Sequence, residues 1–571
     1  MQSDDAYGPW NPGIGSTVPK ELRHLATIYR PENVFNSLAA AAELHGLTGF
    51  GLSELAVFRP QRLALHELLV RITADVAVPD GSRIEDLGLN FREMARLVLA
   101  RYLEPEMGAI VGAYERARRE LRDIISAALN GLPREWGPAE IAALERRGAA
   151  AREPAAVSAY KSLARVMSAL FATQGFAWGT KELISGVATD MACNQHGSDC
   201  IGAAIAPTLV RAAAEQGYKL LPRQEHPVVI NTKGPSASGK STLRPLQKNL
   251  AGVIGVQWSD FALISPDIWR KQLLDYATLG LAYKYAGAFT SDELQIVDQK
   301  LDRYMAGKHQ RGEMSHLLID RFRFDSFAPD SDEEGSNLLT RFGKTVYLFF
   351  VITPPELLVE RAWKRGLEVG RYKAVDDTLA HAVDAYTGMP NVFFTWVRRS
   401  DKRIRFEFLD NTVPLGQRPR TVAFGDNDTI NVLDIKRMLD IGRYGRVFVD
   451  AAEAEFLYRD RALLAPEHNS GFLRRCVEEF HHVNFAAQNS GRIYLRIESG
   501  VPAWIDPGAM QTALRDPDTL AGVTAVAPAA LSGGVAASRA EYLRRYEGAE
   551  AADCAAAVPT LGLWGDAAGL E

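Results

Sequence analysis

The spacing of apolar residues divides the chain into four stretches of different character. Residues 1–25 are rich in Gly, Pro and Asp, which favours an extended N-terminal segment. Residues 26–222 repeat apolar positions at helical spacing and predict a helical accessory domain. Residues 223–450 alternate short apolar runs with helical patterns, which is typical of an α/β fold with a parallel sheet flanked by helices. Residues 451–571 show a weaker pattern and predict a small, partly loop-like C-terminal extension.

The same patterns predict individual elements. Expected helices cover Pro60–Ile72, Asn90–Tyr102, Glu106–Leu129, Pro133–Arg147, Val157–Thr173, Ile201–Glu215, Ser241–Ala251, Ile268–Tyr276, Ser291–Gln310, Pro355–Arg365 and Phe472–Phe485. Expected strands cover Val228–Asn231, Phe261–Ser265, His316–Ile319, Thr345–Ile352, Arg403–Leu409, Thr421–Phe424 and Arg492–Glu498. Of these strands, Thr345–Ile352 has the longest apolar run, as expected for a strand buried on both faces.

A glycine-rich loop follows the first expected strand of the α/β region. Residues 234–241 read GPSASGKS and fit the phosphate-binding pattern G-x-x-x-x-G-K-[ST] between a strand and a helix. Glycines let successive N–H groups point inward at phosphates, and the following helix adds its positive end. Lys240 supplies a point charge for the β- and γ-phosphates, and the Ser241 hydroxyl is a ligand for Mg²⁺. The expected ATP-binding residues are Gly234, Pro235, Ser236, Ala237, Ser238, Gly239, Lys240, Ser241 and Thr242.

An acidic residue directly follows the second expected strand, in the run Ser265-Pro-Asp267-Ile-Trp-Arg270. In small P-loop kinases a carboxylate at this place takes the proton of the acceptor hydroxyl, so we expect Asp267 to be a catalytic base. Arg270 lies one turn further along and is expected to bind an anionic group of the substrate. Asp267 also suits the N-cap of the following helix, which is the structural alternative.

A basic run follows the most apolar strand, in the sequence ERAWKRGLEVGRYK. Gly366 and Gly370 favour a mobile loop that closes over ATP, and its arginines would neutralise charge on the transferring phosphoryl group. We expect Arg365 and Arg371 to be catalytic in this sense. The alternative is a solvated helix end, where cations are favoured in any case.

A third candidate region is Asp320-Arg-Phe-Arg-Phe, at the end of a short expected strand. Asp320 is expected to hold Mg²⁺ through water or to contact the substrate, and Arg321 and Arg323 to meet a phosphate. The phenylalanines between the arginines suit a core equally well.

These residues together resemble the zeta-toxin and polynucleotide-kinase-like group of P-loop kinases, over about residues 225–445. The similarity rests on residues 234–241, on Asp267 and Arg270, on the arginines and glycine of the basic run, and on Leu409-Asp410-Asn411 after a late strand. Ser265 stands where the group has the first Asp of its D-x-D element. The resemblance implies ATP- and Mg²⁺-dependent phosphorylation of a hydroxyl on a nucleotide-like or other small acceptor. It also implies that a protein partner, such as an antitoxin, is possible through the helical half.

Two other functions fit the same loop. One is a nucleotide-dependent regulatory or interaction protein with weak ATPase activity, in which the loop switches the helical half between states. The other is a kinase of nucleic-acid 5′-hydroxyls, which needs a basic groove such as one formed by Lys300, Arg303, Lys308 and Arg311. The net charge of −5 argues against nucleic acid as a partner.

Composition places the chain in the cytoplasm. Its 4 cysteines are too few for a disulfide framework and fit a reducing compartment. The N-terminus lacks the basic and then apolar pattern of a secretory signal, and no apolar stretch is long enough to span a membrane. We therefore expect a cytoplasmic protein without membrane contacts.

Overall fold

The computed structural model of the chain describes residues 7–83, 85–321, 337–414, 416–532 and 559–565. The chain divides into two compact units. The sheet unit comprises residues 1–17, 222–265 and 305–571, and the helical unit comprises residues 18–221 and 266–304. This division differs from the linear order of the expected domains, because residues 266–304 group with the helices rather than with the sheet.

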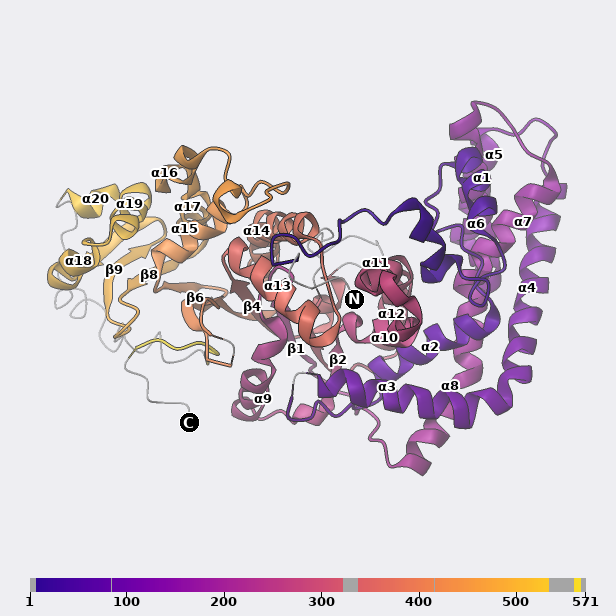
Figure 1. The fold of residues 1–571 in the computed structure, drawn as a ribbon, viewed down its shortest axis with the longest axis horizontal. Coiled ribbons are helices and arrows are strands. Elements are labelled where there is room, and N and C mark those ends of the chain that lie inside the picture. The colour runs from indigo at the N-terminus through magenta and orange to yellow at the C-terminus, as the bar shows by residue number, and fades with distance from the viewer. Residues whose placement is uncertain (1–6, 84, 322–336, 415, 533–558, 566–571) are drawn as a thin grey trace. The chain divides into compact units, whose positions relative to one another are not determined.

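The helical unit is built from the N-terminal half of the chain and from the segment inserted after β2. Its helices are α1 (Leu38–Thr48), α2 (Pro60–Asp75), α3 (Asp86–Val98), α4 (Met107–Asn130), α5 (Pro138–Ala150), α6 (Pro154–Gln174), α7 (Lys181–Ala192), α8 (Ser198–Gln216), α10 (Arg270–Leu273), α11 (Ala286–Phe289) and the first part of α12 (Ser291–Gln310). The helices α4, α6 and α7 pack alongside one another (Figure 1). The apolar spacing did not predict α1 and α7, and α3 begins at Asp86, four residues before the expected start at Asn90.

Buried charges tie α12 into this unit. Glu293 on α12 is fully buried and accepts hydrogen bonds from Arg62 at 2.5 and 2.7 Å. The Nε2 atom of buried His66 lies 2.7 Å from the same carboxylate. Desolvation lowers the pKa of His66 to about 4, so this ring is neutral at pH 7. Removing Arg62 would leave the buried charge of Glu293 without its cationic partner, which costs about 3–5 kcal/mol in comparable cases.

The same buried region contradicts the basic groove suggested for a nucleic-acid kinase. Lys300 is 3% exposed, and its ammonium group donates to Ser198 at 2.6 Å within the helical unit. Lys308 is also buried, and Arg311 is paired with Glu313 at 2.8 Å. Buried cations cannot line a groove for a phosphate backbone, so Lys300 and Lys308 do not contribute to the required surface.

The sheet unit confirms the expected α/β class. Its described strands are β1 (Val228–Lys233), β2 (Phe261–Ile264), β3 (His316–Ile319), β4 (Thr345–Ile352), β5 (Arg403–Asp410), β6 (Arg420–Asp426), β7 (Thr429–Val432), β8 (His482–Ala486), β9 (Ile493–Glu498) and β10 (Val501–Ile505). They form one sheet in the order β10-β9-β8-β7-β6-β5-β4-β1-β3-β2, in which β2, β3, β1, β4 and β5 are parallel. The helices are α9 (Arg244–Val253), α13 (Pro355–Val369), α14 (Val375–Val397), α15 (Ile435–Tyr444), α16 (Pro466–Asn469), α17 (Gly471–Glu479), α18 (Pro507–Ala513), α19 (Pro517–Val526) and α20 (Pro528–Leu531). Among the described residues, no helix has both the length and the apolar character to cross a membrane.

The C-terminal region is more regular than the sequence predicts. The stretch 472–485, expected as one helix, is α17 followed by β8, because Val483–Phe485 pair with Ile430–Val432 of β7. Strands β9 and β10 then extend the same sheet, and α15, α17 and α19 pack together beside them (Figure 1). The region is therefore a continuation of the α/β sheet and not a loop-like extension.

A short C-terminal segment, residues 559–565, is held on the sheet by a buried carboxylate. Glu407 on β5 is 1% exposed and accepts hydrogen bonds from the backbone of Leu561 at 2.6 Å and of Gly562 at 2.9 Å. Thr421 donates a third bond at 2.7 Å. Burial raises the pKa of Glu407 to about 7, although these three donors favour the ionised form and offset part of the shift.

The raised pKa predicts a pH-dependent contribution of Glu407 to stability. The folded chain keeps this proton to higher pH than the unfolded chain, so the contribution is complete below about pH 4.5 and is lost as the pH rises through 7. The free energy of unfolding of the wild type, minus that of Glu407→Gln, should fall by about 2 kcal/mol between pH 5 and pH 8. Urea denaturation at both pH values measures it. The exposed control Glu453→Gln should give no such trend, and a pH-independent difference for Glu407→Gln would contradict the assignment.

Candidate active site

Four segments that carry polar side chains leave the sheet at one edge. The neighbouring parallel strands β3, β1, β4 and β5 end there, and the chain continues into Asp320, Gly234, Thr353 and Asn411, respectively. Ligands of open α/β sheets bind beyond the carboxyl ends of parallel strands. The fold therefore gathers residues that are up to 177 positions apart along the chain, from Gly234 to Asn411, into one candidate site.

The loop after β1 curves tightly around its own backbone. Gly239 has φ 92°, and a Cβ atom there would lie 2.2 Å from the side-chain nitrogen of Asn411. At Gly234 a Cβ atom would lie 2.8 Å from the hydroxyl of Ser238 and 3.0 Å from the carbonyl oxygen of Val351. Only glycine fits these approaches, which explains both glycines of the sequence pattern.

Two residues from neighbouring strands fix the far side of the loop. Asn411 donates from its amide to the carbonyl of Ser238 at 2.7 Å, and Thr353 donates from its hydroxyl to the same oxygen at 3.3 Å. Tyr386 on α14 both donates to the carbonyl of Thr353 and accepts from its N–H, at 2.6 and 2.8 Å. Arg361 on α13 donates to the carbonyls of Asn411 and Val413 at 2.9 Å each. Arg361, which the sequence placed in the lid, therefore supports the segment after β5.

The predicted phosphate and metal residues lie at the start of the following helix. A 3₁₀ turn covers Lys240–Leu243 before α9 begins. The Lys240 ammonium donates to the carbonyls of Gly234 and Pro235, at 3.0 Å each. The Ser241 hydroxyl donates to Asp320 at 3.0 Å. The structure thus brings Ser241 and Asp320 together. Of the remaining loop residues, Thr242 lies in the same 3₁₀ turn, and Ser236 and Ala237 form a separate turn before it.

The oxygen pair of Ser241 and Asp320 suits a magnesium ion. Mg²⁺ prefers hard oxygen ligands and is typically held through one or two carboxylates, with the remaining positions taken by water and phosphate. The described residues contain no group of three or more His, Cys, Asp or Glu that could hold a metal ion by themselves. A site of this kind therefore needs the phosphates of a bound nucleotide to complete it.

The predicted acceptor residues belong to the helical unit. Asp267 lies in a 3₁₀ turn over Pro266–Trp269, and Arg270 begins α10. The Arg270 guanidinium donates to Asp267 at 3.0 Å. It also donates to the carbonyl of Gly287 at 2.6 Å and to the hydroxyl of Thr290 at 2.8 Å. Arg270 therefore joins Asp267 to α11 and to Thr290, which directly precedes α12.

The region expected to be a lid is mostly helical. Helix α13 continues to Val369, four residues beyond its expected end, and contains Arg365. Gly366 lies inside this helix, where a Cβ atom would meet the ring of Tyr372 at 2.6 Å. Gly370 adopts φ 72° as the helix cap, and Arg371 follows it in the short connection to α14. The expected mobile loop is therefore reduced to residues 370–374.

Arg323, a residue after β3 that was expected to meet a phosphate, lies outside the described residues.

Sequence reasoning missed the residues that hold the loop from behind. Asn411 was noted only for its resemblance to a family pattern, while Thr353 and Tyr386 gave no signal of their own. Their position follows from the parallel order β1, β4, β5, which the sequence pattern leaves open.

Comparisons with known proteins add little to this geometry. No family model and no curated protein matches the chain. Among solved structures, a chain from the PezAT chromosomal toxin–antitoxin system of the human pathogen Streptococcus pneumoniae is 17% identical. The match covers 38% of the present chain and 77% of that chain, with a TM-score of 0.25. A likeness of this extent carries no argument about function, which rests on the site itself.

The contact between Gly239 and Asn411 gives a test of the nucleotide loop. Gly239→Ala should weaken ATP binding at least about tenfold, because the new Cβ atom displaces the amide that holds Ser238. Gly255→Ala is a matched control, since Gly255 has φ 74° with nothing within 4 Å of a Cβ atom. Both variants should lose about 1–2 kcal/mol of stability from left-handed alanine. Equal ATP affinities of the two variants, measured by calorimetry, would contradict a nucleotide site at this loop.

Proposed function

We propose that the protein is an ATP- and Mg²⁺-dependent kinase that transfers the γ-phosphate to a hydroxyl of a nucleotide-like or other small molecule. The observation that carries the proposal is the 3.0 Å contact between Ser241 at the end of the glycine-rich loop and Asp320 after β3. A loop serine and a carboxylate from a neighbouring strand are the pair that holds magnesium in P-loop enzymes.

Each part of the loop has a role in this proposal. The N–H groups of residues 234–241 bind the phosphates, and Lys240 exchanges its two carbonyl partners for phosphate oxygens when ATP is present. Ser241 and Asp320 hold Mg²⁺, which neutralises negative charge that develops on the phosphates. Thr353 and Asn411 keep the loop backbone in the conformation that the phosphates require.

The transfer itself needs a base and cations on the acceptor side. Asp267 takes the proton of the acceptor hydroxyl, whose oxygen forms a bond to the γ-phosphorus while the bond to the β–γ bridging oxygen breaks and ADP leaves. Arg365 and Arg371 stabilise the charge on the transferring group. Arg270 orients Asp267 through their 3.0 Å contact and is the candidate contact to an anionic substrate. The helical unit is the candidate surface for a protein partner.

The metal pair is tested by Asp320→Asn. This variant should need at least about tenfold more Mg²⁺ for the metal-dependent tightening of ATP binding, since a neutral amide is a poor ligand for magnesium. A fluorescent ATP analogue titrated with Mg²⁺ measures the change. The control Asp384→Asn removes an exposed carboxylate on α14 and should behave as the wild type. Identical Mg²⁺ curves for Asp320→Asn and the wild type would remove Asp320 from the metal site.

The base is tested by incubation with γ-labelled ATP and a small-metabolite extract, followed by mass spectrometry of any product that gains phosphate. Asp267→Asn should lower the transfer about 10²- to 10⁴-fold while ATP still binds. Lys240→Ala should lose productive ATP binding itself. Normal turnover of Asp267→Asn would exclude it as the base. ATP binding without any phosphorylated product from the wild type would favour a nucleotide-dependent regulatory protein.

A further inference from the structure

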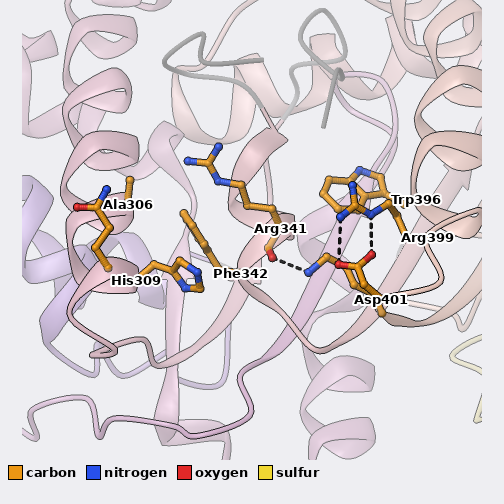
Figure 2. Close-up of a pocket in the computed structure, with 9 residues that line it drawn as sticks. Ala306, His309, Arg341, Phe342, Trp396, Arg399 and Asp401 are labelled. Carbon is orange, nitrogen blue, oxygen red and sulfur yellow. Dashed lines mark hydrogen bonds and ion pairs between the residues drawn. The ribbon is translucent and has the colours of Figure 1, made fainter. Parts of the chain in front are cut away.

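A cavity lies in the sheet unit, at the end of β4 opposite the glycine-rich loop. It has a volume of about 310 Å³ and is lined by the last turn of α12, by residues just before β4 and by the connection from α14 to β5. Figure 2 shows His309, Arg341 and Phe342 on one side of it and Trp396, Arg399 and Asp401 on the other. A volume of this size lies at the lower end of the range for small-molecule sites.

The lining of this cavity is strongly cationic. It contains Arg341, Arg399 and Lys402 but a single carboxylate, Asp401. Arg399 is paired with Asp401 through two hydrogen bonds of 2.7 and 3.0 Å. Lys402 donates to the backbone carbonyls of Arg341 and Gly343 at 2.5 and 2.7 Å, which hold its charge without neutralising it. Asp401 also lies close enough to act electrostatically on Lys402, so one carboxylate faces three cations and the lining carries a net charge of about +2.

Among the cations of the cavity wall, Arg341 is the one most available to a ligand. Its guanidinium lies 4.9 Å from the centre of the Phe342 ring. No carboxylate pairs with it in the part of the chain that the structure describes. The exposed Lys344 lies three residues further on and adds to the same field. Partial burial, and then Arg341, Lys402 and Lys344, lower the pKa of His309, so this ring is neutral at pH 7 and can donate a hydrogen bond.

Trp396 supplies a further unused donor in the cavity wall. Its side chain is 2% exposed, and the indole Nε1 has no hydrogen-bond partner among the described residues. Buried donors in native proteins are nearly always paired, so an unpaired one calls for an acceptor that the chain itself does not provide.

We infer that this cavity is a binding site for a small molecule that carries a phosphate group. A phosphate monoester carries about two negative charges at neutral pH, which matches the excess of two positive charges in the lining (three cations, one carboxylate). Its oxygens accept hydrogen bonds from guanidinium, ammonium and neutral ring donors alike. An extended nucleic acid suits the site less well, because the cavity is small.

The site is separate from the nucleotide loop. Arg341 and Lys344 come just before the first residue of β4, whereas the loop contacts Val351 near its last residue. The eight residues of β4 span about 25 Å in an extended strand. A ligand in this cavity therefore cannot touch the loop.

The test uses the full-length chain carrying Lys240→Ala, so that the nucleotide loop contributes little phosphate binding. Inorganic phosphate, titrated by calorimetry, should bind saturably to this protein. Adding Arg341→Gln should weaken the binding about tenfold, because one charge-assisted contact is lost. Adding Lys402→Gln should weaken it by a similar factor. Adding Arg474→Gln, which removes an exposed cation on α17, should leave it unchanged.

Three outcomes would overturn the inference. One is the absence of saturable phosphate binding to the Lys240→Ala protein. Another is an affinity that Arg341→Gln leaves unchanged. The third is a short single-stranded oligonucleotide that binds more tightly than phosphate and is equally sensitive to Arg341→Gln, because it would identify a nucleic-acid surface instead. Arg341 makes no hydrogen bond through its guanidinium among the described residues, so Arg341→Gln breaks none and is expected to fold. The test therefore stays decisive even if Lys402→Gln fails to fold.

Discussion

The hydrogen bond from Asn411 to the carbonyl of Ser238 is the constraint around which the candidate site is built. It fixes a loop after β1 from the end of β5, although β4 lies between these two strands. The loop can accept it because Gly239 has no side chain in the way. Thr353, held by Tyr386, reaches the same carbonyl from the end of β4. The loop conformation is thus set by three parallel strands acting together, which keeps its N–H groups fixed before any ligand arrives.

The helical unit depends on a different kind of interaction. Glu293 is buried with Arg62 and His66 as partners, and Lys300 is buried against Ser198. Such networks stabilise little compared with an apolar core, but a partly formed one is very unfavourable. They therefore favour a single position of α12 against α2 and α8. Since α12 continues to Gln310, the helix that carries this network also contributes His309 to the cationic cavity of the sheet unit.

Much of the sheet was predictable from the sequence, because alternating and continuous apolar runs identify strands directly. The strands β1, β3 and β4 begin where expected, and the position of the glycine-rich loop follows from residues 234–241 alone. The order of the strands is not encoded in local pattern, so the support from Thr353, Tyr386 and Asn411 could not be predicted. The apolar pattern also gave a wrong prediction where a helix is followed closely by a strand without a turn signal. It predicted one helix over residues 472–485, whereas α17 ends at Glu479 and β8 begins at His482. The length of the mobile loop was overestimated, because a glycine such as Gly366 suggests flexibility in a sequence. In the structure Gly366 lies inside α13, and the ring of Tyr372 packs against it.

The insertion of residues 266–304 into the sheet unit has a consequence for folding during synthesis on the ribosome. Arg62 on α2 and Ser198 on α8 are synthesised before their buried partners Glu293 and Lys300 on α12, so these interactions form only after α12 has been made. By then β1 and β2 have already emerged, although both neighbours of β1 in the sheet, β3 and β4, are still to be synthesised. A growing chain therefore exposes unpaired strand edges over a long interval, the condition under which nascent proteins aggregate and need chaperones.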